Sequence, residues 1–569
     1  MRFVKNNYHI LLILIGSIFW SLTMVRSGLT YTFGMGFWGP NGHDGVWHIA
    51  LANSLARNGF SNLEMPVFAG SQLTNYHIGF DLILGFLRKI TFIPTENLYF
   101  QILPVIVAVL TGILTYKFVL LWKKSKAQAL WATFFVYFGG SFGWIVTLLR
   151  NGDIGGESMF WSQQAGSTLI NPPFALSVVL ILIGLILLVN LKNKFSIKCL
   201  LLLILIFGIA VQVKVYGGIL SIGALFILGL MQILKERRYG FLALFTGSLI
   251  FAAALFLPLN KNSSSMLVFQ PFWFLETMMA LSDRFGWQKF YEAMITYRSG
   301  GVWVKALIAY TSAFVIFMVG NLGTRAIGVL EARRQIQANN PDYLGVFMLS
   351  VIMLGIFFPM IFLQKGTPWN TIQFFYYSLF FLGIFAGVQL GKMQERWKPP
   401  FKLFAMGTII LFTVPTVFST VWYHYLPSRP PAKVSNLELE ALRFLNKQPV
   451  GTVLTFPFDR RAAELAQANP PRPLYLYEST AYVSAFSDKP VYLEDEVNLD
   501  ITGYDWKTRR KTVLDFLASM DHEKVRDFLR VNNIKYVYWV KPQRATLGES
   551  QLGMTRIFEN KEVEIYKVD

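Results

Sequence analysis

The stretch Gly42-His43-Asp44-Gly45-Val46-Trp47-His48 lies near the start of a polar loop between two hydrophobic runs. The loop covers residues 27–97 and mixes Gly and Asn with aromatic side chains such as Trp38 and Phe80. Aromatic side chains bury large areas when they pack. We therefore expect a folded loop that carries a functional site, rather than a linker.

The composition of the 569-residue chain is that of a polytopic membrane protein. Hydrophobic residues make up 54% of it, and the mean hydropathy is +0.43. A chain of this composition is too apolar to be a soluble enzyme. The net charge of +19 lies in the hydrophobic part, since residues 424–569 carry 21 basic against 20 acidic side chains. A basic excess between spans is typical of cytoplasmic loops and gives no support to nucleic-acid binding.

Eleven hydrophobic runs are candidates for crossing a bilayer, which takes about 20 residues. They cover residues 8–23, 98–122, 127–149, 173–189, 199–211, a sixth run that ends at Lys235, 241–257, 302–322, 344–363, 372–390 and 403–421. The distribution of Lys and Arg places the N-terminus inside and the loop 27–97 outside. The first run lacks a small-residue cleavage site, so we expect it to be retained as a span. The only cysteine, Cys199, lies in a hydrophobic run, so we expect no disulfide framework.

Residues 76–87 predict a helix of a different kind. The segment has only about a dozen residues before Arg88 and Lys89, which is too short to span a bilayer. It is amphipathic and ends in a basic pair. We expect it to lie in the outer membrane interface.

A second domain begins near residue 427, where prolines punctuate a segment of soluble character. We predict a transmembrane domain over residues 1–423 and a small extracytoplasmic α/β domain over residues 424–569. Within the latter, strands are predicted at 451–456, 491–493 and 534–540, helices at 509–520 and 522–531, and a hairpin at 555–568.

Asp44 is the first candidate catalytic residue. A carboxylate just beyond the first span could act as the general base for an acceptor hydroxyl or amine. It could instead bind a divalent cation, Mg or Mn, that grips a phosphate. The structural alternative is that Asp44 caps the helix that begins near Gly45.

Two further carboxylates lie on the next outer loop, at Asp153 and Glu157. Either could complete a base or metal constellation with Asp44, and Asp153 is favoured over Glu157. Asp44 and Asp153 are the candidate ligands if a metal is bound. Since the loop is rich in Gly, a solvated turn is the structural alternative.

Three basic residues are candidates for binding a lipid phosphate on the outer side. Lys214 interrupts a hydrophobic segment there against the topological bias, and snorkelling to the interface is its alternative role. Arg298 and Lys365 are weaker candidates. His48 and His77 could bind substrate but show no zinc-type spacing, so a structural use is the alternative. Nucleotide hydrolysis and acyl transfer have no support, because neither a phosphate-binding glycine loop nor a nucleophile elbow is present.

The order of these features resembles the GT-C superfamily of integral-membrane glycosyltransferases, which use polyprenyl-phosphate sugars. The superfamily includes protein mannosyltransferases, aminoarabinose transferases and oligosaccharyltransferase catalytic subunits. The shared features are an inner N-terminus, an acid after the first span, Tyr76-His77-Ile78-Gly79-Phe80 at the interfacial helix, and an acidic second outer loop. The resemblance covers residues 1–259 by arrangement, and residues 475–538 look like the periplasmic tail of bacterial members.

The resemblance implies that Asp44 is the first-loop acid, that Asp153 or Glu157 is the second, and that Tyr76 and His77 lie at the substrate. It implies inverting transfer of a hexose or pentose from a polyprenyl-phosphate donor to a lipid, glycan or protein acceptor, at the outer face of a bacterial cytoplasmic membrane. The prolines usual at Tyr76–Gly79 are absent, and the first loop has no Asp-x-Asp pair.

A non-catalytic transporter of lipid-linked glycans, or an envelope assembly protein, is the alternative function. Such a protein needs charged residues along a path through the whole bilayer. The inner halves of the predicted spans offer almost none.

Overall fold

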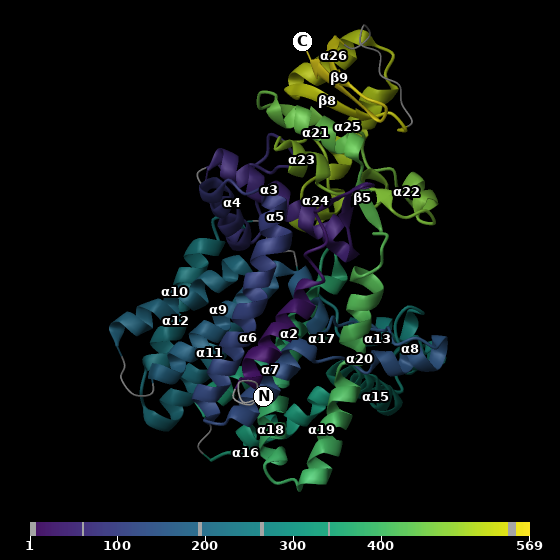
Figure 1. The fold of residues 1–569 in the computed structure, drawn as a ribbon. Helices are drawn as coiled ribbons and strands as arrows, with labels where there is room; N and C mark the ends of the chain where they lie inside the picture. The colour runs from purple at the N-terminus through teal and green to yellow at the C-terminus, as the bar shows by residue number, and fades with distance from the viewer. Residues whose placement is uncertain are drawn as a thin grey trace. The chain divides into compact units, whose positions relative to one another are not determined.

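The computed structural model (Figure 1) describes residues 7–59, 62–191, 196–261, 267–339, 342–543 and 553–568. The chain packs into two compact units. Unit 1 comprises Met1–Thr23, Pro104–Pro258 and Asn262–Leu426, and unit 2 comprises Met24–Leu103, Leu259–Lys261 and Pro427–Asp569. The predicted boundary at residue 423 lies close to the junction after Leu426. Most of the outer loop, however, packs in the same unit as the C-terminal residues.

Helices, most of them apolar, make up unit 1. They are α2 (Tyr8–Ser21), α6 (Leu103–Lys123), α7 (Lys126–Phe138), α8 (Gly143–Asn151), α9 (Pro172–Leu191), α10 (Ile197–Val213), α11 (Val215–Glu236), α12 (Gly240–Phe256), α13 (Trp273–Ala280), α14 (Gln288–Ser299), α15 (Trp303–Leu322), α16 (Gly328–Gln337), α17 (Tyr343–Ile361), α18 (Gln373–Gln394), α19 (Pro399–Thr413) and α20 (Pro415–Thr420). A short antiparallel pair joins β3 (Leu267–Phe269) to β4 (Phe362–Gln364).

Seven helices within the described residues are long and apolar enough to cross a membrane, or eight if α7 and α8, bent by 45° to each other, form one span. Shorter apolar helices, α2, α10 and α12, account for the remaining predicted runs. Each of the eleven runs therefore coincides with a helix or a helix pair. The prediction of a multi-pass helical membrane protein is confirmed.

The centre of unit 1 is α18, whose residues are buried from Phe374 to Gly391 except for Tyr376. A helix that is hydrophobic on all sides belongs in an interior. It packs closely on α7. At Gly387 the two backbones are so near that any larger side chain would meet the backbone of Ala132. Small residues permit this close approach of helix backbones.

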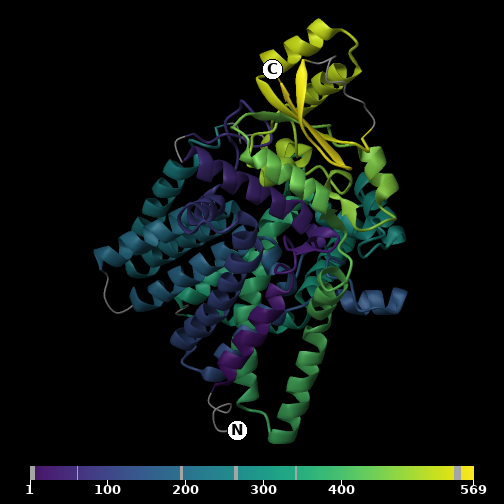
Figure 2. The same ribbon diagram turned by 45° about the horizontal axis from the view of Figure 1, so that its top comes forward.

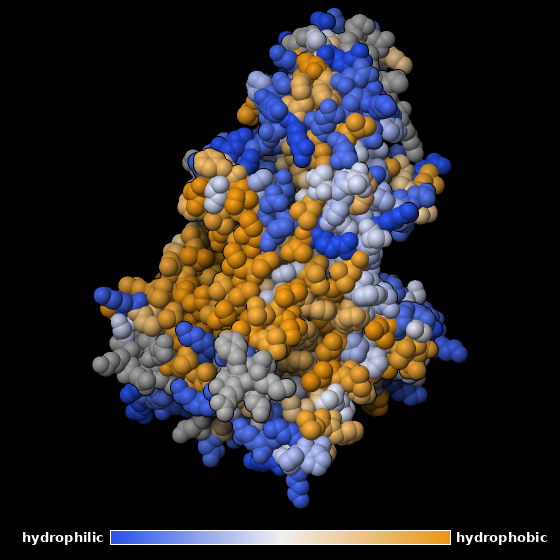
Figure 3. Space-filling model, in the orientation of Figure 1, coloured by the Kyte–Doolittle hydropathy of each residue, from blue (hydrophilic) through white to orange (hydrophobic). Residues whose placement is uncertain are grey.

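The outer surface of unit 1 is apolar as well. Figure 3 shows a broad hydrophobic area over the helices of this unit, whereas the surface of the C-terminal residues is largely hydrophilic. Leu201 and Leu205 of α10 and Ile250 of α12 are among the exposed large side chains. Exposed apolar area of this extent is characteristic of helices that contact lipid.

Unit 2 contains two four-stranded sheets. The first has the order β1 (Thr30–Tyr31), β2 (Gly34–Phe37), β5 (Ala432–Val434) and β7 (Arg472–Pro473), with Met35 opposite Val434 in the antiparallel pair. The second has the order β6 (Thr452–Leu454), β8 (Ile534–Val540), β10 (Val563–Val568) and β9 (Met554–Glu559). Figure 2 shows the strands of the second sheet near the C-terminus. The first sheet thus joins two outer-loop strands to two C-terminal strands.

The helices of unit 2 are α3 (Asp44–Asn58), α4 (Gly79–Thr91), α5 (Thr95–Asn97), α21 (Asn436–Lys447), α22 (Arg460–Ala466), α23 (Tyr482–Ser487), α24 (Glu496–Thr502), α25 (Trp506–Ala518) and α26 (His522–Val531). The predicted strands at 451–456 and 534–540, the helices at 509–520 and 522–531, and the hairpin at 555–568 are all present within a few residues. Residues 491–493 form only an isolated bridge, through Val491. The small C-terminal α/β region is confirmed.

The predicted interfacial helix corresponds to α4. It buries Phe80 and Leu84 against the unit and exposes Ile83, Phe86 and Ile90. This division confirms an amphipathic helix, and its place at a membrane surface stays a prediction. Of its two terminal basic residues, Arg88 pairs with Asp488 at 2.7 Å.

Candidate active site

Asp44 is the first residue of α3, and its side chain is 54% exposed. A turn of 3-10 helix, Gly39–Gly42, ends directly before it, and Pro40 accepts the backbone N–H of His43. The N-cap position of α3 is His43, and no side-chain cap hydrogen bond is present. Asp44 thus stands one residue after the N-cap position.

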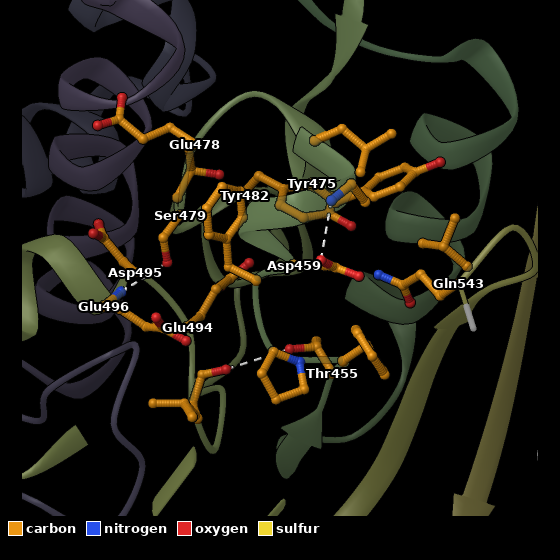
Figure 4. Close-up of a pocket in the computed structure, with 18 of the residues that line it drawn as sticks. Thr455, Asp459, Tyr475, Glu478, Ser479, Tyr482, Glu494, Asp495, Glu496 and Gln543 are labelled. Atoms are coloured by element: carbon orange, nitrogen blue, oxygen red, sulfur yellow. Dashed lines mark hydrogen bonds between the residues drawn. The ribbon is translucent and has the colours of Figure 1, made fainter. Parts of the chain in front are cut away.

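His43 holds Asp44 from one side. Its Nδ1 lies 2.9 Å from Oδ1 of Asp44, and its Nε2 lies 3.4 Å from Oδ1 of Asp495. Burial lowers the pKa of His43, but Asp495 and then Asp44 outweigh it and raise that pKa well above 6.5. His43 is thus an imidazolium at neutral pH that links an acid of the outer loop to an acid of the C-terminal region (Figure 4 labels Asp495).

A third carboxylate, Glu478, belongs to the same cluster. Burial raises its pKa, His43 opposes that effect, and the negative charges of Asp44 and Asp495 add to it. Three acids therefore surround one imidazolium. Sequence reasoning missed Asp495 and Glu478, although the acidic run Glu494-Asp495-Glu496 was a local signal.

The charged state of His43 gives a prediction about pH. A raised pKa in the folded state means that the stabilisation is complete below the unfolded value of about 6.5 and is lost as the pH rises through the folded value. Glu494, whose pKa burial raises to about 8, changes stability in the same direction. We expect the melting temperature of the intact chain to fall from about pH 6 to about pH 9, and to fall less in His43→Gln.

Thermal unfolding in detergent at a series of pH values measures this effect. The matched control is His522→Gln, since His522 is exposed on α26 and should leave the slope unchanged. Equal slopes for His43→Gln and the unmodified chain would contradict the charged state assigned to His43.

His48 lies inside the packing of α3 on α4. Its Nδ1 is 2.7 Å from Oδ1 of Asp81, both side chains are buried, and the His48 ring stacks on Tyr99 with ring centres 5.6 Å apart. The structure thus gives His48 a packing role, and its predicted contact with substrate stays a prediction. Sequence reasoning did not single out Asp81.

Tyr76 and His77 stack on each other, with ring centres 4.7 Å apart. Trp47 of α3 meets the Tyr76 ring edge-on at 5.5 Å. Burial and the charge of Asp81 raise the pKa of Tyr76 well above 10, so its hydroxyl stays protonated. The pair is built into the same unit as Asp44, and its predicted role at the substrate stays a prediction.

Glu157 and Asp153 of unit 1 have different surroundings. Asp153 accepts the backbone N–H of Gly155 at 2.8 Å, which is the hydrogen bond of a tight turn. Glu157 accepts the backbone N–H of Gln164 at 2.9 Å and the hydroxyl of Ser167 at 2.8 Å. Burial nevertheless raises the pKa of Glu157 to about 7. Of the two, Glu157 is therefore suited to exchange a proton near neutral pH.

The three basic candidates lie in unit 1. Lys214 is buried at the break between α10 and α11, with its Nζ 5.4 Å from the centre of the Tyr216 ring. Arg298 at the end of α14 pairs with Glu276, so its charge is balanced. Lys365 is exposed in the turn after β4. Burial of a cation makes Lys214 the strongest of the three.

We next consider a metal ion at the candidate site. Among the residues that the structure describes, no group of three or more His, Cys, Asp and Glu side chains is placed to hold a metal ion. The protonated His43 beside Asp44 is itself a cation and would repel a divalent ion. The residues of this cluster therefore do not fit Mg or Mn.

Solved structures of similar fold were found. The archaeal oligosaccharyltransferase AglB from Archaeoglobus fulgidus, in complex with an inhibitory peptide and a dolichol-phosphate, has a TM-score of 0.50 at 12% identity over 94% of this chain and 70% of that one. The same enzyme in complex with Zn and sulfate has a TM-score of 0.50 at 13% identity over 93% of this chain and 68% of that one. Arabinofuranosyltransferase AftD from Mycobacteria has a TM-score of 0.51 at 11% identity over 99% of this chain, which spans only 40% of AftD.

No model of a known protein family matches the sequence, and no curated protein matches it. The structural likeness shows that the fold of this chain is similar to that of two membrane glycosyltransferases of the GT-C type. The particular structures that carry it are AglB and AftD, each matched over more than nine tenths of this chain.

Proposed function

We propose that this protein is a membrane glycosyltransferase that moves a sugar from a polyprenyl-phosphate-linked donor to an acceptor at the outer face of the cytoplasmic membrane. The observation that carries the proposal is Asp44, an exposed carboxylate fixed by an imidazolium in a chain of GT-C fold. The acceptor class left open by the sequence is a lipid, a glycan or a protein.

In the proposed reaction Asp44 is the general base. It takes the proton from an acceptor hydroxyl or amine while that group attacks the anomeric carbon of the donor sugar. The bond between this carbon and the phosphate oxygen breaks, and the lipid phosphate leaves with the electron pair, so that the configuration inverts. A neighbouring imidazolium favours the ionised form of a carboxylate, which is the form that a base needs.

Two residues of unit 1 have proposed supporting roles. Lys214, a buried cation, would balance the charge of a leaving phosphate. Glu157, whose pKa burial raises to about 7, would assist as a second base. Convergence of these groups with Asp44 stays a prediction.

Transfer of radiolabelled sugar from synthetic polyprenyl-phosphate donors by the purified protein in lipid vesicles tests the proposal. We expect label to move to an acceptor lipid, glycan or protein in a membrane extract. If the protein instead carried a lipid-linked glycan across the vesicle bilayer without transfer, the transporter alternative would replace the enzyme.

Glu157 gives a second prediction about pH. If it acts as a base, transfer increases as the pH rises through about 7, because the ionised form accumulates. We expect Glu157→Gln to lower the rate about 100-fold and to remove this rise. Asp153→Asn is the matched control and should keep both the rate and the profile. An unchanged profile in Glu157→Gln would exclude the role.

A further inference from the structure

A cavity of about 140 Å³ lies in the C-terminal part of unit 2. It is walled by the segments 455–459, 475–482 and 493–496, with Gln543 at one side (Figure 4). An engineered protein cavity of about 150 Å³ holds a benzene molecule. The cavity thus has room for one six-membered ring or for the end of a long side chain.

The charge of the lining is negative. Its carboxylates are Asp459, Glu478, Glu494, Asp495 and Glu496, and no Lys, Arg or His is among the lining residues that the structure describes. Glu496 pairs with Arg510, which lies outside the lining, and Glu494 accepts backbone N–H groups of Val483 and Ser484 at 2.8 and 3.0 Å. Burial raises the pKa of Glu494 to about 8, so this group adds no charge at neutral pH, and Asp495 faces the imidazolium of His43. The four other acids of the lining still outnumber the two cations that pair with them, Arg510 and His43. A phosphate or other anion would be repelled.

Aromatic rings complete the wall. Phe456, Phe458, Tyr475, Tyr482 and Tyr538 line the cavity beside the acids. The face of an aromatic ring carries partial negative charge and attracts an ammonium or guanidinium group. Rings and carboxylates together therefore favour a cation that also has an apolar body.

A buried hydroxyl in the lining points independently to a ligand. Thr480 is only 4% exposed, and its Oγ1 has no hydrogen-bond partner among the residues that the structure describes. Buried polar atoms without a partner are uncommon in folded proteins, because such an atom gives up its hydrogen bonds to water without replacing them, which costs free energy. A ligand with hydrogen-bond donors would supply the missing contact.

We propose that this cavity binds an amine-bearing, positively charged group of the acceptor. That the ligand is the acceptor rests on the proposed function, whereas binding of a positively charged amine in the cavity does not depend on it. A protonated amine donates three hydrogen bonds and accepts none, which matches a lining of carboxylate and hydroxyl acceptors. The site therefore takes neither the phosphate of the donor lipid nor an anionic acceptor.

The cavity connects to the candidate base through one residue. Asp495 lines the cavity and also lies 3.4 Å from His43, whose other ring nitrogen holds Asp44. All three residues belong to unit 2. An acceptor anchored by its amine in the cavity would thus have neighbouring groups near the exposed carboxylate of Asp44.

Calorimetric titration of the purified full-length protein with three ring compounds tests the proposal. D-glucosamine carries the amine, N-acetyl-D-glucosamine has it neutralised, and D-glucose replaces it with a hydroxyl. At about pH 6.5 we expect glucosamine to bind at least about tenfold more tightly than either neutral sugar. Equal binding of all three would overturn the charge requirement, and absence of glucosamine binding would overturn the site.

Two variants separate binding from folding. Thr480→Val keeps the shape of the side chain and removes a hydroxyl that lacks a partner, so the protein should be at least as stable while glucosamine binds several-fold more weakly. Glu478→Gln should also weaken binding, and the exposed Asp515→Asn should not. Undiminished binding in both cavity variants would contradict the proposal. The titration contains no donor lipid, so its outcome does not depend on whether the protein transfers sugar.

Discussion

Asp44→Asn is expected to abolish sugar transfer, with a loss of about 1000-fold or more in rate. Asparagine keeps the size of the side chain but cannot take a proton from the acceptor, and general base catalysis contributes about 10²–10⁴-fold. The side chain is about half exposed and lies outside the N-cap position of α3, so the fold should persist. Single-turnover transfer from a radiolabelled donor lipid measures the loss.

Asp515→Asn serves as the control for this variant, since it makes the same chemical change on an exposed face of α25. Asp515→Asn should show the melting temperature of the unmodified chain, and Asp44→Asn should show a slightly lower one, because Asp495 alone then faces His43. Transfer that survives in Asp44→Asn would remove Asp44 from the mechanism. Loss of transfer in both variants would show that the assay responds to something other than the base.

Asp81→Ala is expected to have the largest effect on stability, a loss of about 3–5 kcal/mol. Asp81 is fully buried, and its carboxylate lies 2.7 Å from His48, between α3 and α4. Removing one partner leaves a polar group buried without the partner that balanced it, which costs more than the pair contributes. The free energy of unfolding of the intact chain in denaturant reports the change.

Asp81→Asn tests whether the charge or the hydrogen bond matters, because the amide still offers an acceptor oxygen. We expect it to cost less than Asp81→Ala. A double variant with His48→Ala should lose less than the sum of the single losses, because the two side chains are coupled. Additive losses would mean that the pair does not act as a unit.

The membrane helices could be predicted from the sequence because their signal is local. About 20 apolar residues in a row, such as those of α6 or α11, leave few alternatives to a buried or spanning helix. The break between α7 and α8 was also visible, since Gly139 and Gly140 fall inside an apolar run. Whether that break bends the chain depends on packing that the sequence does not display.

Only part of the candidate site could be predicted from the sequence. Asp44 stood out by its place after the first apolar run, but Asp495, which also contacts His43, is more than four hundred positions away in the sequence. The two segments meet through contacts such as the pairing of β2 with β5, two short strands that propensity alone does not identify. The sequence favoured Asp153 over Glu157, whereas the structure favours Glu157, because burial, which the sequence does not display, distinguishes the two.

The sheet shared by β2 and β5 has a consequence for biosynthesis. Trp38 donates a hydrogen bond to the carbonyl of Pro427, a residue 389 positions later. While the ribosome synthesises the helices in between, β2 has only β1 beside it, and its other edge exposes hydrogen-bonding groups. Completion of unit 2 must therefore wait for the last quarter of translation, and a fragment that starts at residue 424 would be missing two strands of its own sheet.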